Sequence, residues 1–189
     1  MNKRFTIYRL TTCALMAALM CVLGPMSIQI GPIPVSFTIF VICLSVYLLG
    51  MKGATISCLV YLILGAVGLP VFSGYAGGLA KLAGPTGGYL IGFVFMALIS
   101  GFVMEKSNAN AVITVLGMIA ATMVDYVFGT VWFILQMECT LWYALTVCVF
   151  PFVLVDLAKI LLATALGKAI RLALLKSNLL PSRETQEQN

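Results

Sequence analysis

The stretch Ala111–Leu135 reads AVITVLGMIAATMVDYVFGTVWFIL and carries a single charged residue, Asp125. As an α-helix it is about 37 Å long, at 1.5 Å per residue. The hydrocarbon core of a bilayer is about 30 Å thick, so an apolar helix of this length is typical of a membrane span. The stretch therefore predicts a transmembrane helix.

The composition of the whole chain supports the same class of protein. Of its 189 residues 62% are hydrophobic and 9% are charged, and the mean hydropathy is +1.11. A soluble domain averages about 25% charged residues. We therefore exclude a cytosolic globular enzyme and expect a polytopic membrane protein. At about 20 residues per span, the chain has room for about six or seven helices.

Six apolar segments predict an all-α integral membrane protein with six transmembrane helices. We expect one domain, 1–189, with a helical bundle at about 10–171 and a polar C-terminal tail at 178–189. Pro151 divides the last apolar stretch, Leu141–Leu166, and proline fits best in the first turn of a helix. The segments are Leu10–Ile30, Val35–Leu49, Ala54–Leu69, Tyr89–Met104, Ala111–Leu135 and one from near Val149–Pro151 to near Leu166.

Basic residues predict the orientation, because Lys and Arg gather on the cytoplasmic side of membrane proteins. With both termini cytoplasmic, nine of the eleven basic residues lie inside, Lys81 lies in an external loop and Lys159 lies within the sixth helix. The opposite orientation places those nine outside. Because they are scattered, they do not indicate a nucleic-acid-binding patch. They are Lys3, Arg4, Arg9, Lys52, Lys106, Lys168, Arg171, Lys176 and Arg183.

Two connections between the predicted helices are unusual. Gly24–Pro34 contains Gly24-Pro25 and Gly31-Pro32-Ile33-Pro34, which interrupt a helix and predict an extended turn. Pro70–Gly88, between the third and fourth helices, is glycine-rich and long, and such connections are usually functional. Both lie outside on the predicted topology. We interpret them as a cover over an outward-facing cavity, with a plain external loop as the alternative.

Asp156 and Lys159 are the most informative charges. They are three residues apart, so they share one face of the sixth helix. If that helix begins near Pro151, both lie in the outer part of the membrane, where charged side chains are costly and usually mark a functional site. We favour a ligand site over a purely structural ion pair, since the glycine-rich connection is predicted on the same side.

Asp125 and the pair Ala14 and Ala18 are further candidates. Asp125 has no cation near it in the sequence, so it must face the bundle interior or pair at a distance, and Lys159 is a candidate partner. Packing or hydrogen bonding between helices is favoured over direct ligand contact for this residue. Small residues four apart, as at Ala14 and Ala18, allow the close approach of another helix, either within the bundle or from a partner.

Three groups of residues carry a resemblance to a known family. They are Gly31-Pro32-Ile33-Pro34-Val35; Gly68-Leu69-Pro70-Val71-Phe72 with Gly77-Gly78 and Gly84-Pro85-Thr86-Gly87-Gly88-Tyr89-Leu90-x-Gly92-Phe93; and Pro151-Phe152-x-x-x-Asp156-x-x-Lys159. Together they resemble the biotin-specific substrate-binding (S) component of energy-coupling-factor transporters, over about Leu10 to Arg171. The block at 84–90 combined with the downstream Asp-x-x-Lys is the most specific part.

The resemblance implies a six-helix protein of a prokaryotic cell membrane, with a high-affinity biotin site near the outer face. It also implies a transmembrane coupling protein and two cytoplasmic ATPases as partners. The chain has no G-x-x-x-x-G-K-[ST] sequence with which to bind ATP phosphates itself. In such families the Ala-x-x-x-Ala pattern of the first helix faces the coupling protein, and here that pattern is Ala14 and Ala18.

The chemistry of biotin suggests roles for the charged pair. Asp156 only accepts hydrogen bonds when ionised and suits a ureido N–H, whereas Lys159 only donates and suits the ureido carbonyl or the carboxylate. The ureido ring is favoured, because a paired Asp and Lys is net neutral. Apolar contacts are expected from Phe72, Tyr75, Tyr89 and Phe152, and close backbone approach from loop glycines such as Gly84.

Two other functions stay open: an S component for a different small vitamin, and an ion-coupled secondary transporter or channel that uses Asp125, Asp156 and Lys159. An enzyme is not expected, because the chain has no His and no G-x-S-x-G or H-E-x-x-H motif. No cofactor and no metal site are expected. The six cysteines form no C-x-x-C pair, and we interpret them as small apolar residues.

Overall fold

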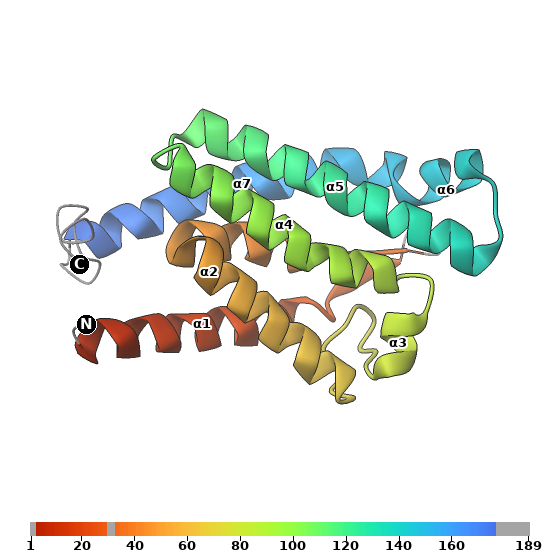
Figure 1. Ribbon diagram of the computed structural model, residues 1–189, viewed down its shortest axis with the longest axis horizontal. Helices are drawn as coiled ribbons and strands as arrows, with labels where there is room; N and C mark the ends of the chain where they lie inside the picture. Colours follow the sequence, from red (N-terminus) through yellow and green to blue (C-terminus); the bar gives the residue numbers. More distant parts are fainter. Residues whose placement is uncertain (1–2, 30–32, 177–189) are drawn as a thin grey trace.

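A computed structural model describes residues 3–29 and 33–176, which form a bundle of helices with one short antiparallel hairpin (Figure 1). The predicted Gly31-Pro32 turn and the predicted tail at 178–189 lie outside the described residues. The elements are α1 (Lys3–Leu23), β1 (Ser27–Gln29), β2 (Pro34–Ser36), α2 (Thr38–Ala66), α3 (Leu79–Ala83), α4 (Gly87–Lys106), α5 (Ala111–Met137), α6 (Leu141–Cys148) and α7 (Phe150–Lys176).

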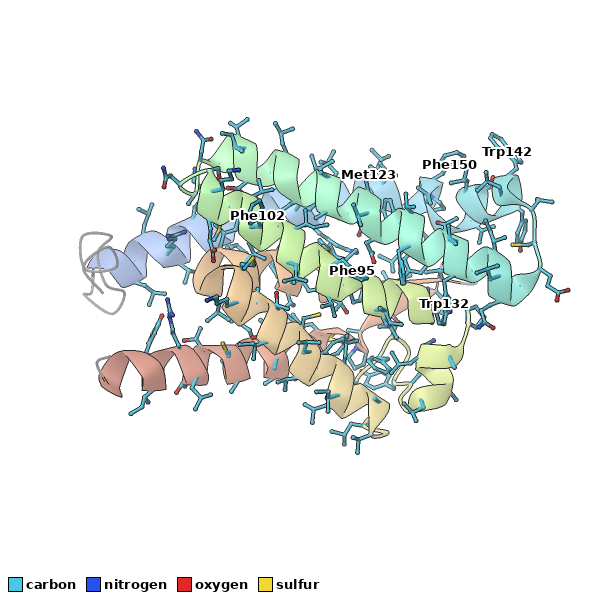
Figure 2. All side chains as sticks on the ribbon, in the orientation of Figure 1. Phe95, Phe102, Met123, Trp132, Trp142 and Phe150 are labelled. Carbon is cyan, nitrogen blue, oxygen red and sulfur yellow. The ribbon has the colours of Figure 1, made fainter. Side chains whose placement is uncertain are left out.

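Within the described residues, four stretches are long and apolar enough to cross a membrane. They are Thr38–Ala66, Gly87–Lys106, Ala111–Met137 and Leu141–Leu174, and Ile7–Leu23 is a shorter apolar helix. Large apolar side chains such as Phe95, Phe102 and Met123 project from the outer surface of α4 and α5 (Figure 2). Soluble monomers rarely expose extended apolar surfaces, so this outer surface is suited to lipid.

The helix α2 bends sharply at Gly50, which has φ 71° and ψ −171° and separates two helical arms (Figure 1). A side chain at this positive φ is strained, and a Cβ atom here would lie 2.6 Å from the Glu105 Oε1 atom. The same Oε1 atom accepts a hydrogen bond of 2.7 Å from the Met51 backbone N–H, at the start of the second arm. The predicted segments Val35–Leu49 and Ala54–Leu69 therefore correspond to the two arms of one bent helix.

The first predicted segment, Leu10–Ile30, is wrong at its C-terminal end, because α1 stops at Leu23 before Gly24-Pro25. The chain then forms β1, which pairs antiparallel with β2. The extended turn predicted for Gly24–Pro34 is present in its described residues. The second segment was predicted to begin at Val35, which lies in β2, so the helix begins three residues later at Thr38.

The sixth predicted helix begins where proline geometry places it. Val149 has φ −120° and ψ −59°, which ends α6, and Pro151 lies in the first turn of α7. Helix α7 continues to Lys176, past the predicted end near Leu166, because no Gly-Pro sequence interrupts it. Trp142 and Tyr143 are exposed on α6, and Trp142 packs edge-to-face on Phe150 (Figure 2).

The glycine-rich connection contains more order than its composition predicts. It includes the short helix α3 and a bridge between Phe72 and Ala76. The indole N–H of Trp132 on α5 donates a 3.0 Å hydrogen bond to the Gly84 carbonyl, which attaches the end of the connection to the bundle. The connection therefore packs on the helices instead of extending away from them.

The two ends of the bundle differ in construction (Figure 1). The start of α1, the Gly50 bend, the α4–α5 connection and the end of α7 lie at one end, which we call the Gly50 end. The β1–β2 hairpin, α3 and α6 lie at the other, which we call the hairpin end.

Helix α2 packs on α1, α4 and α7, and α4 packs on α5. A second apolar cluster, which includes Val35, Tyr89 and Phe152, lies towards the hairpin end.

Candidate functional site

Asp156 and Lys159 form a buried ion pair on α7. The Lys159 Nζ atom lies 2.8 Å from the Asp156 Oδ1 atom, and the two side chains are 9% and 3% exposed respectively. The i,i+3 spacing places both on one helical face, as the sequence predicts. Burial of two charges is costly unless their remaining hydrogen-bonding groups are satisfied, so the surroundings of the pair decide what it can do.

Two other elements complete this pair. The Tyr126 hydroxyl on α5 donates a 2.6 Å hydrogen bond to Asp156 Oδ2. Lys159 Nζ donates a second hydrogen bond, of 2.7 Å, to the backbone carbonyl of Ser36 in β2. Helices α5 and α7 and the hairpin are thus joined through one charged pair. An ammonium has three donors and a carboxylate oxygen has two lone pairs, so both groups keep some capacity for a ligand.

The pair lines a cavity of about 50 Å³. Apolar walls come from Val35, Ile39, Tyr89, Phe93 and Phe152, and the polar lining includes Asp125, Tyr126, Asp156 and Lys159. A mostly apolar cavity with a few converging polar groups is typical of a small-molecule site. A volume of this size holds a few water molecules, so a larger ligand requires the walls to move apart.

Tyr89 and Phe152 are the predicted aromatic contacts that the structure brings into this cavity. The Tyr89 hydroxyl forms a 3.0 Å hydrogen bond with Thr130 Oγ1. The Tyr89 ring lies directly on Gly129 of α5, where any Cβ atom would overlap it. A glycine on one helix therefore sets the position of an aromatic wall carried by another.

Phe72, Tyr75 and Gly84 are not among the residues that line the cavity. Phe72 is fully buried and packs edge-to-face on Tyr61, with ring centroids 5.5 Å apart. Tyr75 is 69% exposed and has a positive φ of 57°. The Gly84 carbonyl accepts the hydrogen bond from Trp132. Their roles as ligand contacts stay predictions, and each would require the glycine-rich connection to change its position.

Asp125 also lines the cavity and is 1% exposed. Neither of its carboxyl oxygens has a hydrogen-bond partner among the described residues. Packing against another helix, one of the two expected roles, is present at Gly92 of α4, whereas the expected hydrogen bond between helices is absent among the described residues. The expected link to Lys159 is wrong, because its Nζ atom bonds to Asp156 and Ser36. Asp125 contributes an unsatisfied carboxyl group to the wall of the cavity.

The sequence prediction missed Tyr126 and Ser36 as partners of the ion pair. Tyr126 is adjacent to Asp125 in the sequence, but nothing in the sequence shows that its hydroxyl reaches a carboxylate on another helix. Ser36 takes part through its backbone carbonyl. Every residue has this group, so the residue type at position 36 does not predict the contact. An intramembrane aromatic hydroxyl close to a charged residue is the one signal that singles out Tyr126.

Ala14 and Ala18 lie on the exposed face of α1, whereas the neighbouring Ala17 is 2% exposed and faces the bundle. Internal packing against another helix of this chain therefore does not explain the Ala-x-x-x-Ala pattern in the described residues. The exposed strip leaves room for the close approach of a helix from outside.

The described residues contain no group of three or more His, Cys, Asp or Glu side chains that could hold a metal ion. The six cysteines are free, and Cys43, Cys58 and Cys148 are buried in apolar surroundings. Their predicted role as small apolar residues agrees with this placement.

Comparison with known proteins adds independent information on the family and the fold of this chain. A model of the BioY family matches residues 1–176. The biotin transporter BioY of Thermotoga maritima is 37% identical over 164 residues, which cover 86% of this chain and 95% of that protein. BioY2 of Lactococcus lactis, also a biotin transporter, is 34% identical over 91% of this chain and 94% of that protein.

A solved structure has the same fold. The crystal structure of the S-component for biotin from an ECF-type ABC transporter superposes with a TM-score of 0.84 and 29% sequence identity. The match covers 90% of this chain and 94% of that chain. The two chains therefore share one overall fold along most of their lengths.

Proposed function

The chain belongs to the BioY family, and we propose that it captures biotin as the substrate-specific component of an energy-coupling-factor transporter. It is a multi-pass protein of a prokaryotic cell membrane. The observation that carries the proposal is the buried Asp156–Lys159 pair, which lines an apolar cavity and keeps unused hydrogen-bonding capacity.

The groups of biotin suit this cavity. Its ureido ring is neutral and carries two N–H donors and one carbonyl acceptor, and its fused thiophane ring is apolar. Asp156 can accept from a ureido N–H and Lys159 can donate to the ureido carbonyl, because neither has used all of its capacity. Aromatic walls from Tyr89, Phe93 and Phe152 suit the apolar ring.

We infer six membrane crossings: α1, the two arms of α2, α4, α5 and α7. Lys52 follows the Gly50 bend and Lys106 ends α4, both at the Gly50 end, whereas Lys81 in α3 lies at the hairpin end. By the positive-inside rule the Gly50 end is cytoplasmic and the hairpin end is external. The cavity then opens towards the outside, the side from which a vitamin is captured.

The cavity of about 50 Å³ is smaller than a bicyclic vitamin, so binding requires the hairpin end to open. The wall formed by Ile33, Val35 and Ser36 is the part most suited to move, because it belongs to a two-stranded hairpin instead of a long helix. Closure after binding would exclude water and strengthen the polar contacts.

Equilibrium binding of labelled biotin to the purified protein in detergent tests the proposal. Wild type should bind, and Asp156→Ala and Lys159→Ala should each weaken binding strongly, because each leaves the other charge buried without its partner. The matched controls are Glu138→Gln and Lys81→Ala, which remove one negative and one positive charge from positions outside the cavity lining. Both variants should bind biotin as wild type does. Absence of binding to wild type, or unchanged affinity in both cavity variants, contradicts the proposal.

Competition separates biotin from other vitamins. Unlabelled biotin should displace the probe, whereas riboflavin and thiamine should not, because neither carries a cyclic urea beside an apolar ring. Displacement by either vitamin with biotin inert would assign the chain to a different substrate. Uptake into cells should depend on the ATPases of the transporter, and proton- or sodium-driven uptake without them would favour a secondary transporter.

We further propose that Ala14 and Ala18 contact the transmembrane coupling protein, which joins this chain to two cytoplasmic ATPases. The support is their exposure on α1 and the small-residue pattern. Replacement of both by Leu should abolish co-purification with the coupling protein and spare biotin binding. Ala120→Leu, at an exposed alanine on α5 on the other side of the bundle, is the control (Figure 1). Loss of binding together with assembly would indicate internal packing instead.

A further inference from the structure

Asp125 is a buried carboxyl group that the proposed contacts with Asp156 and Lys159 do not use. It lies on α5, is 1% exposed, lines the cavity, and has no hydrogen-bond partner among the described residues. A buried polar group without a partner costs stability. Asp125 therefore does not serve the stability of the empty protein, and the cavity is where its oxygens can find a donor.

The neighbouring helix leaves space for this carboxyl group. Gly92 on α4 lies against Asp125, and a Cβ atom at position 92 would overlap Asp125 Oδ1. The carboxyl group thus occupies the room that the missing side chain provides, between α4 and α5. Its position is set by the packing of two long helices, and a group held in this way can present its oxygens to a ligand in a constant place.

The donors and acceptors around the cavity form a definite pattern. Asp156 accepts from Tyr126 and Lys159 and keeps lone pairs on both oxygens. Lys159 donates to Asp156 and Ser36 and keeps its third proton. Asp125 keeps all its capacity. The site therefore has three unused hydrogen-bonding groups: an acceptor on Asp156, a donor on Lys159 and an acceptor on Asp125.

A cyclic urea carries the complementary pattern, an N–H donor, a carbonyl acceptor and a second N–H donor. We propose that Asp125 accepts a hydrogen bond from one ureido N–H, while Asp156 accepts from the other and Lys159 donates to the carbonyl between them. The proposal rests on the proposed function, since it names which part of biotin enters this part of the cavity.

Charge supports the same orientation of the ligand. The Asp156–Lys159 pair is net neutral, and Asp125 adds a further acidic group beside it. A ligand carboxylate placed there would be repelled, whereas a neutral ring with donor groups is favoured. The carboxylate of biotin therefore points away from Asp125, Asp156 and Lys159.

The test combines variants of Asp125 with analogues that each lack one donor. Binding of biotin and of its two mono-N-methylated ureido derivatives is measured for wild type, Asp125→Asn and Asp125→Ala in detergent. Asp125→Ala should weaken biotin binding about 10- to 100-fold, as expected for a lost hydrogen bond to a charged group, and Asp125→Asn by less, because an amide oxygen still accepts.

One methylated derivative should separate direct contact from indirect effects. The derivative that lacks the N–H facing Asp125 should bind wild type and Asp125→Ala with equal affinity. The other derivative keeps that N–H, so Asp125→Ala should weaken its binding by the same factor as for biotin. Thr122→Val is the matched control, because this buried hydroxyl on α5 donates to the Met118 carbonyl of its own helix and lies outside the cavity lining. It should bind biotin as wild type does.

The outcomes separate this inference from the proposed function. If wild type binds biotin but Asp125→Ala retains its affinity, the inference is wrong and the proposed function stands. If Asp125→Ala weakens biotin and both derivatives by the same factor, the effect is structural and the inference is also wrong. If wild type does not bind biotin, both the inference and the proposed function are wrong.

Discussion

Asp125 on α5 and Asp156 on α7 are two carboxyl groups in the wall of one cavity, 1% and 2% exposed, and their surroundings are opposite. Asp156 accepts hydrogen bonds from Tyr126 and Lys159, whereas Asp125 has no partner among the described residues. The protein offsets the cost of burying the first group with its own side chains. The second group, Asp125, keeps its hydrogen-bonding capacity for a ligand in the cavity.

The same substitution at the two positions should therefore act in opposite directions, and the larger effect is expected at Asp156. Asp156→Asn removes the counter-charge of Lys159 and should lower the free energy of unfolding by about 3–5 kcal/mol. Lys159→Met should cost a similar amount, since it leaves the Asp156 carboxylate buried without a cation. Thermal unfolding of the purified protein in detergent measures both.

The double variant Asp156→Asn with Lys159→Met is the control for this prediction. It removes both charges, so it should recover much of the lost stability but bind no biotin. A double variant as unstable as the sum of the single variants would show that the two residues act separately, contrary to the ion pair.

Tyr126→Phe tests the partner that α5 supplies to Asp156. It deletes a hydrogen bond to a charged group, so the free energy of unfolding should fall by about 1.5–3 kcal/mol. Tyr89→Phe is a matched control in the same cavity, because its hydroxyl bonds to the neutral Thr130 and should cost only about 0.5–1.5 kcal/mol. Equal effects would mean that the Tyr126 hydroxyl gains nothing from the charge of Asp156.

Asp125→Asn should raise the stability of the empty protein by about 1 kcal/mol, because a buried amide costs less than a buried carboxylate without a partner. The change should be seen as a higher unfolding temperature without ligand, and it should shrink or reverse in saturating biotin. A lower stability of the empty protein would show that Asp125 has a stabilising partner, and the contrast with Asp156 would no longer hold.

Gly92→Ala should have the smallest net effect, a loss of under about 1 kcal/mol. The added methyl group displaces the Asp125 carboxyl group, while alanine favours the helix by about 0.5–1 kcal/mol. Combining it with Asp125→Ala should remove the penalty, because the overlapping oxygen is gone. The cycle of these variants, followed by thermal unfolding, measures how firmly α4 positions Asp125.

Local patterns predicted the features that depend on neighbouring residues. Pro151 placed the start of α7, Gly24-Pro25 ended α1, and the i,i+3 spacing put Asp156 and Lys159 on one face. The bend at Gly50 lies between two predicted segments. These features follow from backbone geometry and hydrophobicity over short distances, so they can be read without the rest of the molecule.

Predictions that required a distant partner succeeded less well. Phe72 was predicted as a ligand contact because it lies in the glycine-rich connection. Its ring packs against Tyr61 in the core, and its contact with a ligand stays a prediction. Asp125 was expected to pack or hydrogen-bond against another helix, or to pair with Lys159. It packs on Gly92 and has no hydrogen-bond partner among the described residues. Spacing along the chain says nothing about which helix faces a given side chain.

By itself, the sequence determined the membrane class, the apolar segments and the intramembrane charges, since burial of apolar residues and the cost of charge are properties of composition and short-range order. Only the tertiary structure decided how the charges are satisfied. The Lys159 ammonium meets a carbonyl 123 residues away, and Asp156 meets a tyrosine on another helix. Such contacts depend on how helices pack, so the site exists only once the bundle has formed.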